Sequence, residues 1–126
     1  MTWTIDPRRF GEAVKIDHRR LCVSAALEIN KRLILATPVD TGRAQSNWMP
    51  SLGSPASGQR EPMQPAEAMT IAQSTFSAAP PFPVLWLSNN LPYIRRLNQG
   101  HSKQAPAGFV ETVIDGVVSA INGRQL

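Results

Sequence analysis

Residues 85–114 read LWLSNNLPYIRRLNQGHSKQAPAGFVETVI, and this stretch decides the fold because it joins several kinds of element with little spacer. The apolar run at 84–88 predicts a buried or half-buried strand, and the Asn-Asn-Leu-Pro-Tyr segment after it predicts a turn. Residues 93–97 predict a helical turn, and Pro106 is expected to open the last helix. Most polar residues of the stretch lie in two joints, the turn and the basic loop before Pro106.

A long helix is predicted ahead of this stretch. Asp6-Pro7 is typical of a helix start, and Pro38 is expected to end the helix. Such a helix is roughly 45 Å long, more than a domain of this size needs. Part of it should therefore extend beyond the domain or pack against another subunit. Its apolar stripe, with His18 expected beside it or at its border, comprises Phe10, Val14, Leu21, Ala25, Ile29 and Leu33, widened by Cys22 and Ala26.

A short helical segment is predicted after Pro38. Asp40 or Thr41 could cap it, and it would run towards Asn47, while Gly42 permits a left-handed or crowded backbone.

The middle of the chain predicts shorter elements. Residues 48–52 are typical of a strand, although Pro50 interrupts it, and 53–65 (GSPASGQREPMQP) predicts an exposed connection. Pro65 opens a second helix that Pro80 stops. A broad apolar face marks the last helix, which Gly123 should close: Phe109, Val110, Val113, Ile114, Val117, Val118 and Ile121.

This order of elements predicts one α+β domain over residues 1–126. A long N-terminal helix and a C-terminal helix should pack on a small, mainly antiparallel sheet. The length of 126 residues suits a single core and is too short for two ordinary ones. The sequence contains neither a signal-peptide pattern nor an apolar run of about 18 residues. We therefore expect no membrane partner and synthesis in the cytoplasm.

The formal charge of +4, with a pI near 10.0, favours a negatively charged partner without identifying one. The excess is local, because residues 93–104 carry Arg95, Arg96 and Lys103 with no acid. The arginine pairs at 8–9 and 19–20 are expected on the solvated face of the first helix. Cys22 is the only cysteine, which excludes an internal disulfide and a cysteine-rich metal site.

Catalytic and cofactor sites are not indicated. Two histidines and one cysteine have no metal-ligand spacing, and no glycine-rich phosphate-binding pattern occurs. His101, Ser102 and Lys103 are adjacent in a predicted loop, but neither a nucleophile elbow nor a defined acid accompanies them. The sequence therefore predicts a protein that is not an enzyme and that uses no cofactor and no metal.

Nucleic-acid binding is the main alternative. Tyr93 lies close in sequence to Arg95, Arg96 and Lys103, which combines an aromatic ring with cations. The chain would then be a small basic nucleic-acid-binding protein that uses the 93–104 loop. A solvated basic loop explains the same residues equally well, since nucleic-acid-binding modules usually carry denser basic patches.

Three motifs in order resemble a family. They are TPVDTGR at 37–43 after a long helix, NNLPY at 89–93, and GHSKQAPAG at 100–108 before a C-terminal helix. Together they resemble the tail-completion and neck (head-tail joining) proteins of long-tailed bacteriophages, the group that includes the minor tail protein Z type of lambdoid phages. The resemblance covers about residues 10–120 and leaves 53–83 without a strong motif.

The resemblance implies a virion structural protein made in the host cytoplasm. Such a subunit forms a ring with copies of itself, often a hexamer, at the head-proximal end of the tail, in the manner of a tail terminator. It completes the tail tube and joins it to the head connector or stopper protein, with DNA passing through the lumen. Members of this group are not enzymes.

Each interface in a ring joins two different patches of the subunit. The overlong helix and the two polar joints, expected at opposite ends of a strand, could supply them. The alternative is that these polar residues only fold their own loops. For the basic residues, an acidic neighbour, DNA in the lumen and solvent all remain open as partners. The candidate subunit or partner contacts are Asp40, Thr41, Gly42, Arg43, Asn89, Asn90, Tyr93, Arg95, Arg96, His101, Ser102, Lys103 and Gln104.

Overall fold

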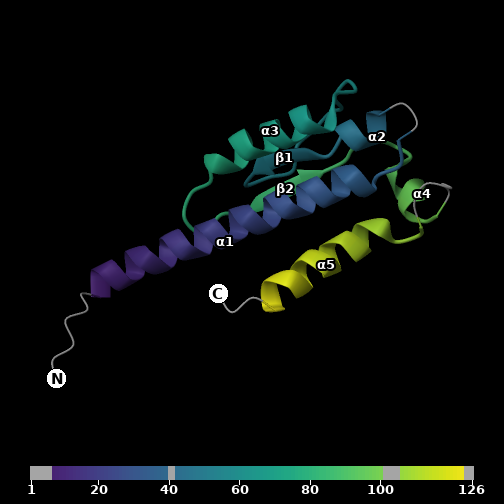
Figure 1. Ribbon diagram of the computed structural model, residues 1–126. Coiled ribbons are helices and arrows are strands. Elements are labelled where there is room, and N and C mark those ends of the chain that lie inside the picture. The colour runs from purple at the N-terminus through teal and green to yellow at the C-terminus, as the bar shows by residue number, and fades with distance from the viewer. Residues whose placement is uncertain (1–6, 40–41, 101–105, 124–126) are drawn as a thin grey trace.

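The computed structural model describes residues 7–39, 42–100 and 106–123, with side chains in the first helix from Lys15 onward. Helix α1 spans Pro7–Ala36, as predicted, and is the longest element (Figure 1). The Thr37 hydroxyl donates a hydrogen bond to the Leu33 carbonyl and accepts one from Trp48 Nε1 at 2.8 Å. Pro38 follows and cannot continue the helix. These bonds fix the direction in which the chain leaves α1.

Helix α1 buries two faces, where the sequence predicted one stripe. Asn30, Leu33 and Ile34 are buried towards the sheet, whereas Leu21 and Ala25 are half-buried beside the C-terminal helix. Asn30 and Ile34 lie outside the predicted stripe because periodicity counts apolar residues and detects the dominant face only. The second face exists because a helix packs on α1 from another side.

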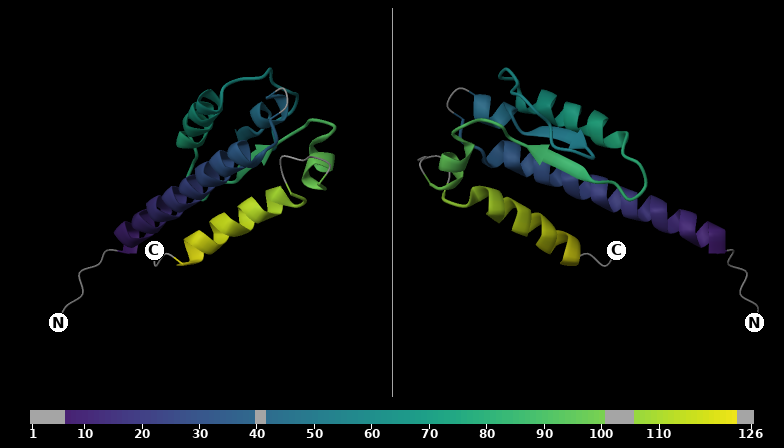
Figure 2. Two further views of the ribbon diagram at one scale, coloured as in Figure 1. Left: turned by 45° about the vertical axis from the view of Figure 1, so that its right-hand side comes forward. Right: turned by 180° about the vertical axis from the view of Figure 1, so that it is seen from behind.

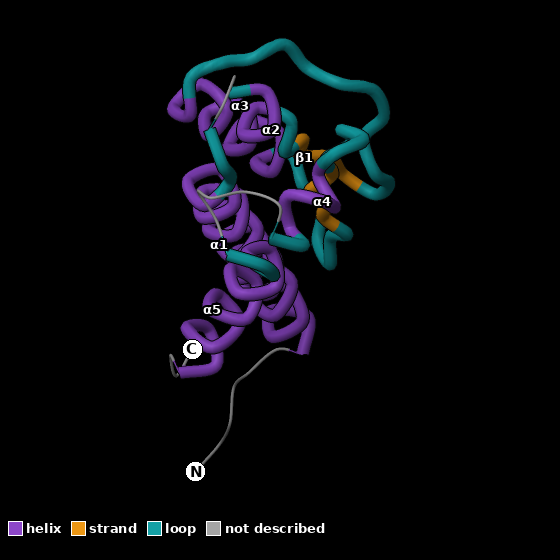
Figure 3. The backbone as a smooth tube through the Cα atoms, turned by 90° about the vertical axis from the view of Figure 1, so that its right-hand side faces the viewer, coloured by secondary structure: helices purple, strands orange, loops and turns teal. Residues whose placement is uncertain are grey.

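The sheet consists of strands β1, Met49–Leu52, and β2, Leu85–Ser88, which pair antiparallel as expected. In the register, Pro50 is opposite Leu87 and Ser51 is opposite Trp86. Helix α3, Pro65–Ser77, packs on β1, and α1 packs on β2 (Figure 1). The N-terminal start of α3 at Pro65 agrees with the prediction. Figure 3 shows the two strands on one side of these helices.

The core lies between the helices and the sheet. Leu33, Ile34, Trp48 and Ala68 form its buried cluster, and Leu87 of β2 packs against that cluster. Ala72 and Phe76, which follow Ala68 at intervals of four residues in α3, are also fully buried. The α+β class, with a long N-terminal helix, a C-terminal helix and a small antiparallel sheet, is therefore confirmed.

The last helix, α5, spans Phe109–Gly123 and starts three residues later than the predicted start at Pro106. Gly108 has a φ of 76°, a left-handed conformation that cannot continue an α-helix. Asn98, the last residue of the short helix α4 (Ile94–Asn98), accepts hydrogen bonds from the Gly108 amide at its carbonyl and from the Val110 amide at its side chain. The position of Asn98 therefore sets the start of α5.

Helix α5 runs antiparallel along α1 and ends beside its middle part (Figures 1 and 2). The N-terminal turns of α1 extend past both α5 and α3 in these views. The expectation that this helix is longer than its own domain requires is thus confirmed. Among the described residues, no helix is both long and apolar enough to cross a bilayer.

One arginine of the first helix departs from the prediction. Arg19 was expected on the solvated face, but its guanidinium donates hydrogen bonds of 2.6 Å to the carbonyls of Ser77 and Ala79. These carbonyls lie at and just beyond the C-terminal end of α3, where a cation is favourable. Arg20, next to it, is exposed as expected. Arg19 therefore ties α3 to α1.

Candidate contact surface

The candidate residues that the structure describes gather at one end of the molecule. We call this the α2–α4 end, defined by the short helix α2 (Arg43–Ser46), the turn at 89–93 and α4. In Figures 1 and 3, α2 and α4 lie at the end where α1 terminates. For the described residues, the expectation of two joints at opposite ends of a strand is wrong, because the turn at 89–93 and α4, which carries Arg95 and Arg96 of the basic loop, both follow β2 at this end. Asp40, Thr41, His101, Ser102, Lys103 and Gln104 lie outside the described residues.

Helix α2 is built without the side-chain cap that the sequence suggested. Its N-cap residue is Gly42, with a φ of 77° and no side-chain cap hydrogen bond, whereas Asp40 or Thr41 was expected to cap it. Gly42 does adopt the left-handed conformation that the sequence predicted. The carbonyl of Gly42 accepts hydrogen bonds from the amide and the hydroxyl of Ser46. Gln45 holds the helix to α1 by donating to the Ile34 carbonyl at 2.9 Å.

Asn47 connects α2 to the segment between β1 and α3. Its side chain is 0% exposed, donates to the carbonyls of Arg43 (2.7 Å) and Arg60 (2.9 Å), and accepts from the Arg60 amide (2.7 Å). Both functions of its amide are therefore satisfied internally. The segment at 53–65 is largely exposed, as predicted, yet it is anchored at Arg60 and Met63.

The Arg60 side chain strengthens this anchor. Its Nε and Nη2 donate to the Ser46 carbonyl at 3.0 and 2.7 Å, and Nη2 also donates to the Trp48 carbonyl at 2.9 Å. Burial lowers the pKa of Arg60 from its ordinary value because the charged form loses hydration. The guanidinium remains charged at neutral pH. Sequence composition placed Arg60 in an exposed connection and gave no sign of this role.

The side-chain amides of the two asparagines after β2 form hydrogen bonds within the fold. Asn89 donates to the Ala44 carbonyl at 3.0 Å and accepts from the Leu91 amide at 3.2 Å. Asn90 donates to the carbonyls of Ala56 and Gly58, both at 3.0 Å. The turn therefore joins α2 to the 53–64 connection. Only the bond from the Leu91 amide to Asn89 lies within the turn itself, whereas the donated bonds reach distant segments of the same chain, so both side chains serve the fold.

The cationic residues of this end are presented to solvent. Tyr93, Arg95 and Arg96 are exposed at the start of α4. Ile94, which lies between Tyr93 and Arg95 in the sequence, packs against the core. Arg43 is exposed on α2 and donates to Gln59 Oε1 at 2.6 Å. Helices α2 and α4 are held to the fold by Gln45 and Ile94, and their exposed sides carry cations next to the ring of Tyr93. This arrangement can meet an acidic protein surface or phosphate groups.

Asn98 also controls the electrostatics at the start of α5. Its Nδ2 donates to both carboxylate oxygens of Glu111 at 2.9 Å. The hydrogen bond from Asn98 and, to a smaller extent, the backbone amide of Glu111 lower the pKa of the Glu111 carboxyl below its ordinary value. Because the folded pKa is depressed, the contribution to stability is present above the unfolded pKa and is lost as pH falls through the folded pKa.

We expect Asn98→Ala to return the Glu111 pKa towards its ordinary value, because the carboxylate loses its principal donor. NMR titration of the Glu111 carboxyl group measures this directly. Asn122→Ala, an exposed amide near the end of the same helix, serves as the control and should leave the titration unchanged. An unaltered Glu111 titration in Asn98→Ala would show that the Asn98 bond is absent in solution.

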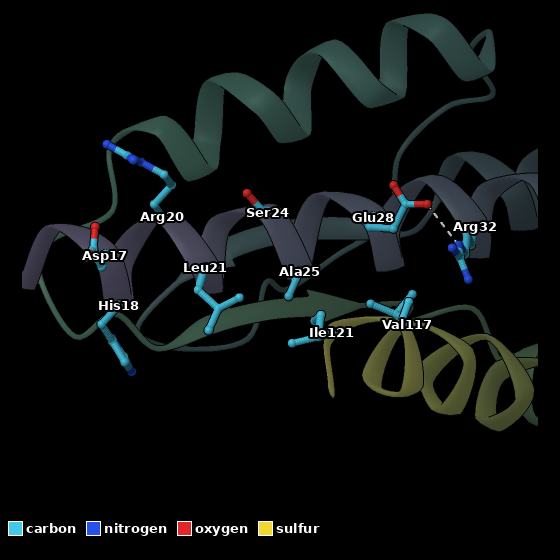
Figure 4. A pocket seen from close by; sticks show the side chains of 11 residues that line it. Asp17, His18, Arg20, Leu21, Ser24, Ala25, Glu28, Arg32, Val117 and Ile121 are labelled. Carbon is cyan, nitrogen blue, oxygen red and sulfur yellow. Dashed lines mark hydrogen bonds and ion pairs between the residues drawn. The ribbon is translucent and has the colours of Figure 1, made fainter. Parts of the chain in front are cut away.

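A groove with a volume of about 780 Å³ lies between residues 17–32 of α1 and the C-terminal half of α5. Leu21 and Ala25 point towards Val117 and Ile121 across it, and Glu28 pairs with Arg32 at 2.9 Å on its rim (Figure 4). The remaining lining residues are Asp17, His18, Arg20, Ser24 and Ala120. The groove has an apolar floor and a charged rim, which is typical of a surface that a protein segment can cover.

His18 lies at one end of this groove. Its ring packs against Phe82 at a tilt of 40° with centroids 4.9 Å apart, and Cys22 Sγ is 3.8 Å from both ring nitrogens. His18 is exposed at the edge of the α1 stripe, in line with the position expected from the sequence. Over the ranges that the structure describes, no three His, Cys, Asp or Glu side chains gather to hold a metal ion.

No protein-family model, no curated protein and no solved structure matches this chain.

Proposed function

We propose that this chain is a structural protein of a bacteriophage virion, of the tail-completion or head-tail joining class. It assembles with copies of itself into a ring, a hexamer by the family resemblance, at the head-proximal end of the tail. The ring completes the tail tube and joins it to the head connector or stopper protein. This proposal starts from the three ordered sequence motifs and draws its structural support from α1.

The projection of α1 carries the proposal. A thirty-residue helix whose N-terminal turns pass beyond α3 and α5 leaves part of its length without an internal layer (Figures 1 and 2). Ile16, on that part, is 54% exposed. In the proposed ring, a different patch of the neighbouring subunit covers the projecting part. Such contacts between unlike patches are the kind that builds rings.

The α2–α4 end supplies a second surface for the assembly. Its described cations, Arg43, Arg95 and Arg96, lie far along α1 from the projecting end (Figure 1). A ring of identical subunits would repeat this basic surface around its axis. We assign it to contact with an acidic neighbouring protein of the neck or with DNA in the lumen.

The proposal predicts a defined assembly phenotype. A phage genome from which the coding sequence is deleted should yield filled heads and separate tails that do not join, because the joint lacks one ring. Electron microscopy of lysates measures this, and supplying the wild-type chain from a plasmid should restore joined particles. Normal, infectious particles from the deletion genome would refute the proposal.

A second candidate function rests on the exposed Tyr93 beside Arg95 and Arg96. In a nucleic-acid-binding protein, these side chains would stack on bases and contact phosphates. Binding should then weaken steeply with salt, and Arg95→Ala with Arg96→Ala should lower the salt slope by about two. Fluorescence anisotropy with a DNA oligonucleotide tests this. Lys31→Ala, an exposed cation on α1, is the control, and equal losses in both variants would exclude site-specific binding by α4.

A further inference from the structure

A stripe of polar and charged side chains runs along the side of α1 that the fold leaves open. Asp17, Arg20, Ser24, Glu28 and Lys31 follow one another at intervals of three or four residues, so they share one face of the helix. Glu28 is half-buried, and the other four residues are exposed. We call these five residues the charged stripe.

The charged stripe lies away from the core and beside the groove. Leu33 belongs to the core cluster and is nine residues, about two and a half turns, from Ser24, so the two side chains are on opposite sides of α1. Every residue of the stripe except Lys31 also lines the groove. In Figure 4, Arg20, Ser24 and Glu28 point away from α5. The stripe and the groove therefore form one continuous surface.

The charges of the stripe change sign across Ser24. Asp17 and Lys31 are each seven residues from Ser24 in opposite directions, and Arg20 and Glu28 are each four residues from it. In an antiparallel pair of α1 helices with a twofold axis at Ser24, Asp17 would face Lys31 of the other copy. Arg20 would likewise face Glu28, whereas a parallel pair would bring like charges together. The stripe is therefore complementary to an antiparallel copy of itself.

These charges are available for such a contact. Over the described residues, Asp17, Arg20 and Lys31 form no ion pair within the chain. Glu28 pairs with Arg32 through Oε1 at 2.9 Å, and a carboxylate can accept further hydrogen bonds at its second oxygen. A partner helix can therefore meet the stripe without breaking an internal ion pair.

The groove adds apolar contact to this charge pattern. Packed helices lie about 8–10 Å apart, and the small side chain of Ser24 permits close approach at the axis. Leu21 and Ala25 line the groove together with Val117 and Ile121 of α5. In the twofold arrangement, Leu21 of each copy lies beside the smaller Ala25 of the other. Burial of these side chains supplies affinity, and the charges set the orientation.

We propose that two copies of the free chain pair through the charged stripe and the adjoining groove, with their α1 helices antiparallel and Ser24 at the twofold axis. The contact is isologous, because the same patch is used on both copies, whereas the proposed ring joins unlike patches. The inference therefore does not rest on the proposed ring. It assigns to the free chain a dimeric state in which the apolar floor of the groove is covered.

The first test places a single cysteine at the axis. Ser24→Cys in a Cys22→Ser background should yield a disulfide-linked homodimer under mild oxidation, measured by mass spectrometry without reductant. Directly facing residues on helices at this separation come within the distance that a disulfide spans. Lys31→Cys in the same background is the control, since its two copies would lie about 21 Å apart along the helices and should not link.

A mixture tests the register of the pair. Chains that carry Asp17→Cys should link to chains that carry Lys31→Cys, again in the Cys22→Ser background, because these positions face each other. A parallel pair would instead link Ser24→Cys and Lys31→Cys each with its own copy. Links in both of those variants, or in neither, would overturn the inference, as would the absence of the 17–31 link.

The second test exchanges charges. Arg20→Glu and Glu28→Arg should each weaken dimerisation about tenfold in sedimentation equilibrium, because attraction becomes repulsion at two symmetrical places. The double variant Arg20→Glu/Glu28→Arg should restore the wild-type dissociation constant, since opposite charges face each other again. Circular dichroism should be unchanged in all three variants, because neither side chain belongs to the core.

Three results of the second test would contradict the dimer. They are a wild-type chain that sediments only as a monomer, single variants that dimerise like the wild type, and a double variant no better than the single ones. Each of them would leave the proposed ring standing, because the ring is tested by joined particles and uses other contacts.

Discussion

Asn47→Ala is expected to lower the free energy of unfolding by about 3 kcal/mol, because three buried hydrogen bonds lose their side-chain partner. The carbonyls of Arg43 and Arg60 and the Arg60 amide would be left with these bonds unmade. Asn47 is itself fully buried, so in the alanine variant water cannot readily take over its hydrogen bonds. Urea unfolding followed by circular dichroism measures the change.

Asn90→Ala is the matched control for this experiment. Asn90 donates two bonds of the same kind to backbone carbonyls, but its side chain is exposed and water can replace it. We expect a loss of at most about 1 kcal/mol. Equal losses in the two variants would contradict the assignment of Asn47 as the residue that anchors α2 to the 53–64 connection.

Gly100→Val has the second large expected effect, a loss of about 3 kcal/mol in the free energy of unfolding. Gly100 has a φ of 95°, which a β-branched residue adopts only with strain. A Cβ built there would also lie 3.1 Å from Ala107 Cβ, closer than ordinary contact. Backbone strain and overlap therefore act together, and the link between α4 and α5 should be distorted.

Two other glycines separate these causes. Gly42 has a φ of 77°, but a Cβ there meets its nearest neighbour, Pro62 Cβ, at 4.0 Å. Gly42→Val should therefore cost only the strain, about 1.5 kcal/mol. Gly123→Val, at the end of α5 with open space around it, should change stability little. Urea midpoints that rank these three variants in another order would contradict the turn geometry.

The elements of the fold were predictable because their signals are local. Proline or glycine marks the start or end of α1, α3 and α5, and hydrophobic periodicity distinguishes the helices from β2. The start of α5 was misplaced because its position depends on Asn98, which acts across a turn. The start of α1 follows from Asp6-Pro7. The second buried face of α1 could not be predicted in this way, because it depends on α5, which lies about a hundred residues later in the sequence.

The candidate contact surface was predictable only in part. Local patterns identified Tyr93, Arg95 and Arg96, whose exposure the structure shows. The same reasoning could not separate them from Asn89 and Asn90, whose amides bond to segments more than thirty residues away. The buried network of Asn47 and Arg60 left no pattern in the sequence, since each is an ordinary polar residue until the chain folds around it.

The copy number of this chain in purified virions tests the central claim most directly. Quantitative mass spectrometry of particles, with the major head and tail-tube proteins as internal standards, provides that number. A single ring at the head-tail joint predicts about six copies per particle. Absence of the chain from purified particles, or a copy number comparable with that of the tail-tube protein, would contradict its assignment as a joint protein.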